Sequence, residues 1–400
     1  MKIIYITSLL SKQGSSASIR NTSLINGLSK IGHDVTVLTI KYPQEVLDDY
    51  LINEIHENIN VIEVDSGLIS RYVPRLAKKS GFSQKRKASL LTEFKKMVKD
   101  VIFFPDVDAG WIKSSKKEFI KLNLEVFDIM ISSSDTKTSH YVAKNIKKKF
   151  NNLKWIQIWG DPWYSDVNVM SSFKRIRIKY AEEKILKIAD LVFYVSLPTQ
   201  IEMSKKHPLI DMRYVPRGYL NNVDKISVDS IKSFKMVYTG LITGRNIKPI
   251  ISAIEAFNSS NNIPIKLFFY GRVDLELVSQ YEHIDFVEFK GQVSLHEVMY
   301  VYQWADILLL IGNDKVTTQI PGKLYDYFGT KCSILVLLED LNNEVAKFIK
   351  ATGRCNVFLN VKEEINLKSI CNSSIDELFL EEYSPESIAR NLITQVVSVL

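Results

Sequence analysis

The chain has 400 residues, of which 46% are hydrophobic and 24% are charged, and its formal net charge is +7. These proportions are those of an ordinary globular protein, and the length predicts two domains. No apolar run reaches the roughly 18 residues that a membrane-spanning helix requires. The three cysteines and six histidines are scattered, which argues against a disulfide framework and a zinc site and favours the reducing cytoplasm.

The first half alternates strand-like and helix-like segments. The run at 2–9 predicts a buried strand rather than a signal peptide, because no small-residue cleavage site follows it. Helical apolar spacing follows at 17–32 and ends at Gly32. Strands separated by helices predict a parallel sheet covered on both faces. Further strands are expected at 33–42, 126–134, 154–163 (strand, then loop) and 190–196, and further helices at 138–150 and 172–189.

The positive charge is concentrated in residues 71–99, where ten Lys and Arg accompany a single acid, Glu93. Such a segment attracts phosphate groups, either of an anionic membrane or of a lipid-linked diphosphate. A solvated surface is the alternative, and nucleic-acid binding is the weakest interpretation because the charge is confined to one region. The candidate acceptor or membrane face consists of Lys78, Lys79, Lys85, Arg86 and Lys87.

The segment at 213–233 interrupts the alternation with Pro, Gly and a pair of Asn residues, which is typical of a domain junction. The pattern then restarts and predicts a second β/α sheet of Rossmann type. A final amphipathic helix begins after Ser384, a suitable N-cap, with Glu386 in its first turn. Strands are expected at 234–240, 265–271, 284–291, 306–312 and 333–337, and helices at 246–260, 274–281 and 294–305. The expected domains are 1–216 and 217–383, followed by the helix at 384–400.

Two tandem α/β sheets are expected to bind ligands at the carboxyl ends of their strands, in a cleft between the domains. Gly14 lies in the loop after the first strand, where a glycine lets the backbone approach an anion at a helix start. A plain flexible loop is the alternative. Asp161 follows a later strand, between Trp159 and Trp163, which suits sugar hydroxyls and ring stacking. A turn Asp beside core tryptophans would give the same pattern.

The first strand-to-helix turn of the second half, at 238–249, combines glycines with cations. Gly240 and Gly244 free the backbone, while Arg245 and Lys248 lie beside a helix start, where the helix macrodipole disfavours positive charge. A diphosphate bound between the two cations would explain them, because Arg binds phosphate through a planar fork. Two solvent-directed side chains are the alternative.

A third candidate lies before the strand at 333–337. Pro-Gly begins a predicted helix after Thr317 and Thr318, Lys323 lies in its first turn, and Asp326 follows one turn later on the same face. A cation for phosphate and a carboxylate for ribose hydroxyls would together bind a nucleotide. An ordinary surface ion pair is the alternative.

Together these segments resemble bacterial glycosyltransferase family 4, whose members have the two-Rossmann GT-B fold. The second half resembles it in "VYTGLITGRNIKPIISAIEAF", "GQVSLHEVMYVYQWADILLLIG" and "IPGKLYDYFGTKCSIL". The first half agrees through "SSASIRNTSLINGLSKIGHDVTVLT", "FFPDVDAGW" and "QIWGDPW", and the junction through "RYVPRGY". The resemblance is weak at 44–100 and 355–383.

The resemblance implies that Arg245 and Lys323 bind the donor diphosphate, with Lys248 as a second cation, and that Asp326 binds the ribose. It implies that Asp161 orients a sugar, that transfer occurs with retention, and that no metal or other cofactor is required. It also implies that the last helix returns to the first domain. The other donor-binding residues that it implies are Gly14, Gly240, Gly244, Gly271, Arg272, Gln292, Val293, Thr318 and Gly322.

The leading hypothesis is therefore a cytoplasmic, membrane-peripheral glycosyltransferase. It would use a UDP- or GDP-linked hexose or N-acetylhexosamine to extend a lipid-linked oligosaccharide for a bacterial surface polysaccharide such as O antigen or capsule. One alternative is a GT-B-like nucleotide-sugar 2-epimerase. The other is a scaffold that has lost catalysis, suggested by Thr318 and Asp326 at positions where the family usually has Glu.

Overall fold

The structure is a computed structural model that describes residues 1–66, 82–83, 104–164, 172–226, 232–312, 318–372 and 378–400. Contacts divide the chain into two compact units. The first unit runs to Leu220 and also includes the last helix, from Ser384 onward. The second covers Asn221–Tyr383 together with the short strand β4. This division falls close to the junction expected from the sequence.

The first unit contains a seven-stranded parallel sheet in the order β3-β2-β1-β5-β6-β7-β8. The chain therefore moves outward from β1 in one direction and returns to the other side of β1 at β5. Such a reversal is a topological switch point, where open α/β sheets bind ligands beyond the strand carboxyl ends. The strands are β1 (Lys2–Ile6), β2 (Asp34–Ile40), β3 (Asn60–Val64), β5 (Ile129–Ser134), β6 (Lys154–Trp159), β7 (Leu191–Tyr194) and β8 (Met212–Tyr214).

Helices connect these strands. Ser15 caps the first, accepting a hydrogen bond from the Ser18 amide, as N-cap hydroxyls do. The helices of this unit are α1 (Ser16–Lys30), α2 (Asp49–Asn53), α5 (Trp111–Lys121), α6 (Thr138–Lys149), α7 (Ser172–Leu186), α8 (Leu197–Lys206) and α15 (Pro385–Val397).

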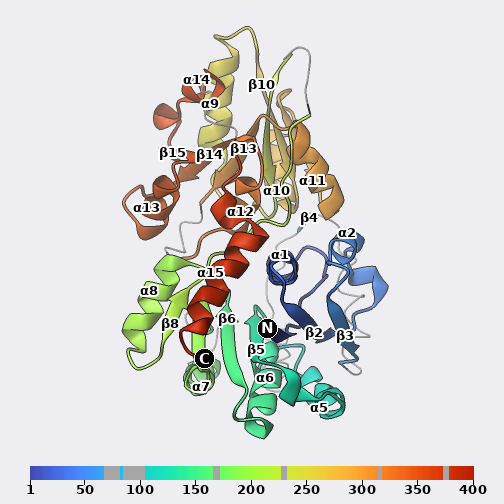
Figure 1. Cartoon of the computed structure of the whole chain (residues 1–400). Coiled ribbons are helices and arrows are strands. Elements are labelled where there is room, and N and C mark those ends of the chain that lie inside the picture. The colour runs from blue at the N-terminus through green and yellow to red at the C-terminus, as the bar shows by residue number, and fades with distance from the viewer. Residues whose placement is uncertain (67–81, 84–103, 165–171, 227–231, 313–317, 373–377) are drawn as a thin grey trace, which may run out of the picture. The chain divides into compact units, whose positions relative to one another are not determined.

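The last helix, α15, packs along α1 (Figure 1). Ser384 is its N-cap, as the sequence predicts, and accepts a hydrogen bond from the Ser387 amide. Gly27 of α1 is the point of closest approach, because a Cβ atom there would lie 2.0 Å from the Pro385 carbonyl oxygen. The expected return of this helix to the first domain is confirmed.

The second unit contains a six-stranded parallel sheet in the order β12-β10-β9-β13-β14-β15. Its switch point lies between β9 and β13, which are direct neighbours. A two-residue strand, β11 (Val273–Asp274), pairs with β4 (Phe82–Ser83). The strands of the sheet are β9 (Phe234–Thr239), β10 (Ile265–Tyr270), β12 (Val287–Gly291), β13 (Ile307–Ile311), β14 (Ser333–Leu338) and β15 (Cys355–Leu359). The helices are α9 (Lys248–Asn258), α10 (Leu275–Tyr281), α11 (Leu295–Trp304), α12 (Gly322–Phe328), α13 (Glu344–Ala351) and α14 (Leu367–Asn372).

Each unit has its own apolar core, and the central strands β1, β5, β9 and β13 are almost wholly buried. Two parallel sheets with connecting helices confirm the predicted class, a pair of Rossmann-like domains. Among the described residues, no helix has both the length and the apolar character needed to cross a bilayer.

Candidate functional site

Arg245 and Lys323 meet at the switch point of the second sheet, and each reaches across it. Arg245 follows β9, and its guanidinium donates hydrogen bonds to the carbonyl oxygens of Ile311 and Gly312, at the end of β13. Lys323 follows β13, and its ammonium donates to the Thr239 carbonyl oxygen, at the end of β9. The two cations predicted from separate sequence segments therefore share one site.

The surroundings of Lys323 disfavour its positive charge. Its Nζ lies 3.7 Å from the centre of the Tyr238 ring. Burial, followed by the positive charge of Arg245, holds the pKa of Lys323 well below its usual value, and Asp326 opposes this shift. Among the described residues, the Arg245 side chain donates hydrogen bonds to the backbone carbonyls of Leu241, Ile311 and Gly312. Because the two positive charges repel each other, a negatively charged group beside them would stabilise both, and a phosphate group can supply that charge.

Glycines with positive φ lie at the carboxyl ends of three neighbouring strands of this sheet, with Gly240 and Gly271 directly after β9 and β10 and Gly291 as the last residue of β12. Gly240, Gly271 and Gly291 have φ values of +98°, +131° and +72°. At Gly271 a Cβ atom would lie 2.2 Å from the Gly240 carbonyl oxygen, so only glycine fits. At Gly240 a Cβ atom would lie 3.2 Å from the Lys323 ammonium nitrogen. Next to the two cations, Gly240 and Gly271 therefore leave the backbone uncovered by side chains of their own.

The other residues predicted in this unit lie at or near the same edge. Gly322 is the first residue of α12, and Thr318 precedes it in a half-buried position. Asp326 is half-buried on α12, within electrostatic reach of Lys323. The side chain of Lys248 is exposed at the start of α9, so the described contacts do not bring it to the two cations. Gly244 has a φ of +76° and an exposed position; Arg272 and Gln292 are exposed, and Val293 is half-buried.

The switch point of the first sheet carries a charged pair that the sequence patterns did not single out. Arg20 of α1 is only 6% exposed and forms a 3.1 Å ion pair with Asp135, which directly follows β5. It also donates to Ser133, at 3.3 Å. A Cβ atom at Gly160 would lie 2.2 Å from the Asp135 carboxylate and 2.8 Å from the Arg20 guanidinium. The sequence feature that could have indicated this pair is Arg20 itself, a charged residue inside the apolar pattern of the first helix.

Gly14 precedes the N-cap of α1 with a φ of +62°, in an exposed loop after β1. This loop and Asp135 therefore follow the two strands that flank the switch point of the first sheet. That a ligand approaches the backbone at Gly14 stays a prediction.

The Asp161 side chain is exposed immediately after β6, and Lys137 donates to its backbone carbonyl at 2.9 Å. The two flanking tryptophans are in the core, since Trp159 and Trp163 are 0% and 6% exposed. Trp159 packs against His140 at a centroid distance of 4.5 Å, and Trp163 against Phe104 at 5.3 Å. The expectation of sugar stacking on these rings is therefore wrong, because protein rings already cover them.

A second feature absent from the sequence expectations is the carboxyl pair of Asp106 and Asp108. Asp106 caps α6 from a distance, accepting hydrogen bonds from the Thr138 amide at 2.9 Å and its hydroxyl at 2.7 Å. Asp108 is buried and accepts a 3.2 Å hydrogen bond from Tyr42. Burial, with a smaller contribution from Asp106, raises the pKa of Asp108 to about 6.

The basic residues Lys78, Lys79, Lys85, Arg86 and Lys87 lie outside the described residues. Within the described part of the chain, no three His, Cys, Asp or Glu side chains gather as a metal site would require.

No protein-family model and no curated protein sequence matches the chain. Its fold, however, is found in solved structures. A protein from Listeria monocytogenes, assigned provisionally as a UDP-N-acetylglucosamine 2-epimerase, is 11% identical with a TM-score of 0.56, and the match covers 99% of this chain and 96% of that one. The N-terminal domain of trehalose-6-phosphate phosphatase from Candida albicans is also 11% identical with a TM-score of 0.56, covering 100% and 97%.

The glycosyltransferase of kitacinnamycin is 10% identical over 98% of both chains, with a TM-score of 0.49. At these identities the comparisons establish the fold, and the chain has the two-domain GT-B architecture that its sequence predicts.

Proposed function

We propose that the protein is a retaining glycosyltransferase that moves a hexose or N-acetylhexosamine from a UDP- or GDP-linked donor to a lipid-linked oligosaccharide. The acceptor would belong to a bacterial surface polysaccharide such as O antigen or capsule, and the enzyme would act at the inner face of the plasma membrane. The crossed arrangement of Arg245 and Lys323 at the second switch point carries the donor half of this proposal.

The site suits a nucleoside diphosphate because it combines charge with access to the backbone. The two cations would face the diphosphate, while the left-handed turns at Gly240 and Gly271 let the ligand approach the strand ends. Asp326, within electrostatic reach of Lys323, would accept the ribose hydroxyls. A diphosphate that binds at this point would replace the backbone carbonyls as the partner of both cations.

The same contacts would lower the barrier for transfer. Negative charge develops on the leaving diphosphate in the transition state, and preorganised cations stabilise it more than they stabilise the bound donor. Positioning of the acceptor hydroxyl would supply much of the remaining rate enhancement. Asp161 is the first-unit residue proposed to orient a sugar, through its exposed carboxylate.

Nucleotide binding tests the donor site directly. We expect UDP or GDP to bind the wild-type protein in isothermal titration calorimetry, and Arg245→Ala and Lys323→Ala each to weaken binding by about 10- to 100-fold, because each removes charged hydrogen bonds. Lys350→Ala, which removes an exposed lysine of α13, is the control and should bind as the wild type does. Unchanged affinity in both site variants would refute the site, and absence of all nucleotide binding at millimolar concentration would favour a scaffold.

A nucleotide-sugar 2-epimerase is the second candidate. The sequence suggested only Asp161 for such chemistry, whereas the structure adds Asp135, Asp108 and His140 to the first unit. His140, however, is fully buried, and its ring nitrogen contacts Ser132 at 2.8 Å. Incubation with UDP-N-acetylglucosamine alone distinguishes the two functions: a manno product identifies an epimerase, whereas a transferase yields none.

A further inference from the structure

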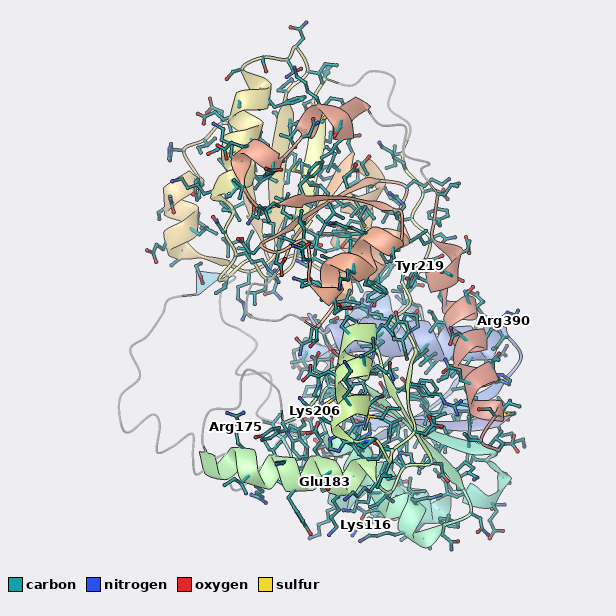
Figure 2. The ribbon with its side chains drawn as sticks, turned by 90° about the vertical axis from the view of Figure 1, so that its left-hand side faces the viewer. Lys116, Arg175, Glu183, Lys206, Tyr219 and Arg390 are labelled. Atoms are coloured by element: carbon teal, nitrogen blue, oxygen red, sulfur yellow. The ribbon has the colours of Figure 1, made fainter. Side chains whose placement is uncertain are left out.

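The outward face of α7 is strongly basic. Arg175, Lys179 and Lys184 are exposed along it, and exposed Lys187 directly follows its last residue. Figure 2 shows Arg175 near the start of this helix and Glu183 farther along it. Glu183 is the one acid on this described face, and Lys187 pairs with it at 2.6 Å. Arg175, Lys179 and Lys184 form no ion pair within 4 Å with a carboxylate of the described residues, although Lys179 lies within electrostatic reach of Glu183.

The end of the neighbouring helix α6 adds cations to the same surface. Lys144, Lys148 and Lys149 lie there, and burial together with the charges of Lys148 and Lys184 lowers the pKa of Lys144. The lysines of the two helices are thus close enough to repel one another. Two nearby acids have other partners. Asp190 pairs with Lys147 at 2.8 Å, and buried Glu182 accepts hydrogen bonds from the backbone amides of Trp163 and Tyr164.

Two large apolar side chains project among these cations. Ile176 is 71% exposed and Tyr180 is 68% exposed, one helical turn apart on α7. Lys184 lies over the Tyr180 ring at 5.8 Å. Exposed apolar side chains flanked by Lys and Arg are the pattern of helices that lie on a bilayer, where tyrosine prefers the headgroup level. A nucleic-acid surface would match the charge but would give Ile176 no partner.

We propose that the α6–α7 face, defined by Lys144, Lys148, Arg175, Ile176, Lys179, Tyr180 and Lys184, docks on an anionic lipid bilayer. Ile176 and Tyr180 enter the headgroup region, and the surrounding cations neutralise lipid phosphates. The expected partner is the membrane surface itself, because a net excess of positive charge surrounds exposed apolar side chains on this described face.

This surface is joined to the expected acceptor region of the first unit. Arg175 lies over the Tyr164 ring at 5.1 Å, and Glu182, on the inner side of α7, holds the Trp163 and Tyr164 amides at 2.6 and 3.0 Å. Asp161 lies in the same loop. The inference thereby deepens the proposed function, on which this link rests, by naming a surface through which a lipid-linked acceptor would arrive. Vesicle binding itself requires neither donor nor transfer.

Co-sedimentation of the full chain with vesicles tests the proposal. We expect the protein to bind vesicles of phosphatidylcholine with 30% phosphatidylglycerol at least about tenfold more tightly than pure phosphatidylcholine, because each basic residue near the surface adds to the attraction. The triple variant Arg175→Glu, Lys179→Glu and Lys184→Glu should lower the partition coefficient about 10- to 100-fold. It should fold, since it relieves repulsion among lysines.

Matched variants separate this surface from other sources of charge. The triple variant Lys350→Glu, Lys362→Glu and Lys368→Glu makes the same charge change on exposed residues of the second unit and should retain binding. Ile176→Ser with Tyr180→Ser should reduce binding about tenfold without altering net charge, whereas Tyr300→Ser, which removes a 57% exposed ring, should not.

Equal binding to both vesicle types, or wild-type binding by the α7 triple variant, would overturn the proposal. Loss of binding on reversal of Lys78, Lys85 and Arg86 alone would assign the membrane contact to the 71–99 segment instead. Binding to duplex DNA that survives Ile176→Ser with Tyr180→Ser, while vesicles are not bound, would show a polyanion surface. Titration of the same variants with UDP or GDP distinguishes failure of the membrane surface from failure of the donor site, because the donor site lies in the second unit and should bind nucleotide whether or not vesicles are bound.

Discussion

The two sheets have the same strand topology, but the cations at their carboxyl edges have different partners. In the first unit, Arg20 is buried against Asp135, so positive charge is neutralised within the protein. In the second unit, Arg245 and Lys323 face backbone carbonyls and repel each other. The Arg20 charge therefore has a carboxylate partner within the protein, whereas the described hydrogen bonds of Arg245 and Lys323 go to backbone carbonyls. The same sheet topology can therefore hold a cation in two ways, against a carboxylate at one edge and against backbone carbonyls at the other.

The largest expected effect concerns the glycines of the two edges. Gly271→Ala should destabilise the protein by more than about 3 kcal/mol, because φ is +131° and the new Cβ would strike the Gly240 backbone. Gly160→Ala should cost about 1–2 kcal/mol, because the obstructing atoms belong to side chains that can move. Urea unfolding measures both. Equal losses would show that the two edges are equally rigid.

Matched removal of one arginine from each edge should separate stability from binding. Arg20→Gln should lower the free energy of unfolding by about 1–3 kcal/mol, since it breaks a buried ion pair. Arg245→Gln should leave stability within about 1 kcal/mol of the wild type and should weaken nucleotide binding instead. Chemical denaturation and calorimetry on the same samples measure the two effects. If Arg245→Gln were the more destabilising variant, the contrast between the edges would fail.

The most gradual expected effect is a pH dependence from Asp108. Its folded-state pKa of about 6 lies above the ordinary value of 3.8 for an aspartate, so between these values the folded protein binds a proton that the unfolded chain releases. Stability from this group should therefore rise as pH falls through this window, by at most about 1.4 kcal/mol per pH unit. Asp108→Asn should flatten the pH profile of the free energy of unfolding between pH 4 and 6. If Asp108→Asn left this pH profile unchanged, Asp108 would not be the group that causes the pH dependence.

Sequence patterns predicted the fold well because hydrophobic periodicity is local. Strands such as Ile307–Ile311 and the capped helix that follows Ser384 lie within a residue or two of their expected positions. The pairing of Arg245 with Lys323 was also accessible, since both follow strands whose carboxyl ends meet at one switch point.

Other parts of the site depend on contacts across long stretches of chain. Arg20 meets Asp135 across 115 residues, and Asp106 caps α6 from 32 residues away. No local pattern reports such partners. The tryptophans beside Asp161 were misjudged for a related reason, because burial depends on the rings that pack over them, Phe104 and His140. The side chain of Lys248 is exposed, whereas that of Arg245 contacts the end of β13, and the spacing of the two residues along the sequence does not distinguish these directions.

The packing of α15 against α1 has a consequence for biosynthesis. Residues Asn221–Tyr383 form a continuous stretch of the chain, whereas the first unit gains α15 only after that stretch has been made. The notch at Gly27, shaped for Pro385, and the apolar residues around it remain uncovered on a growing chain. Domains generally fold as units during synthesis. The first unit can therefore complete its packing only after the last residues of the chain have been made.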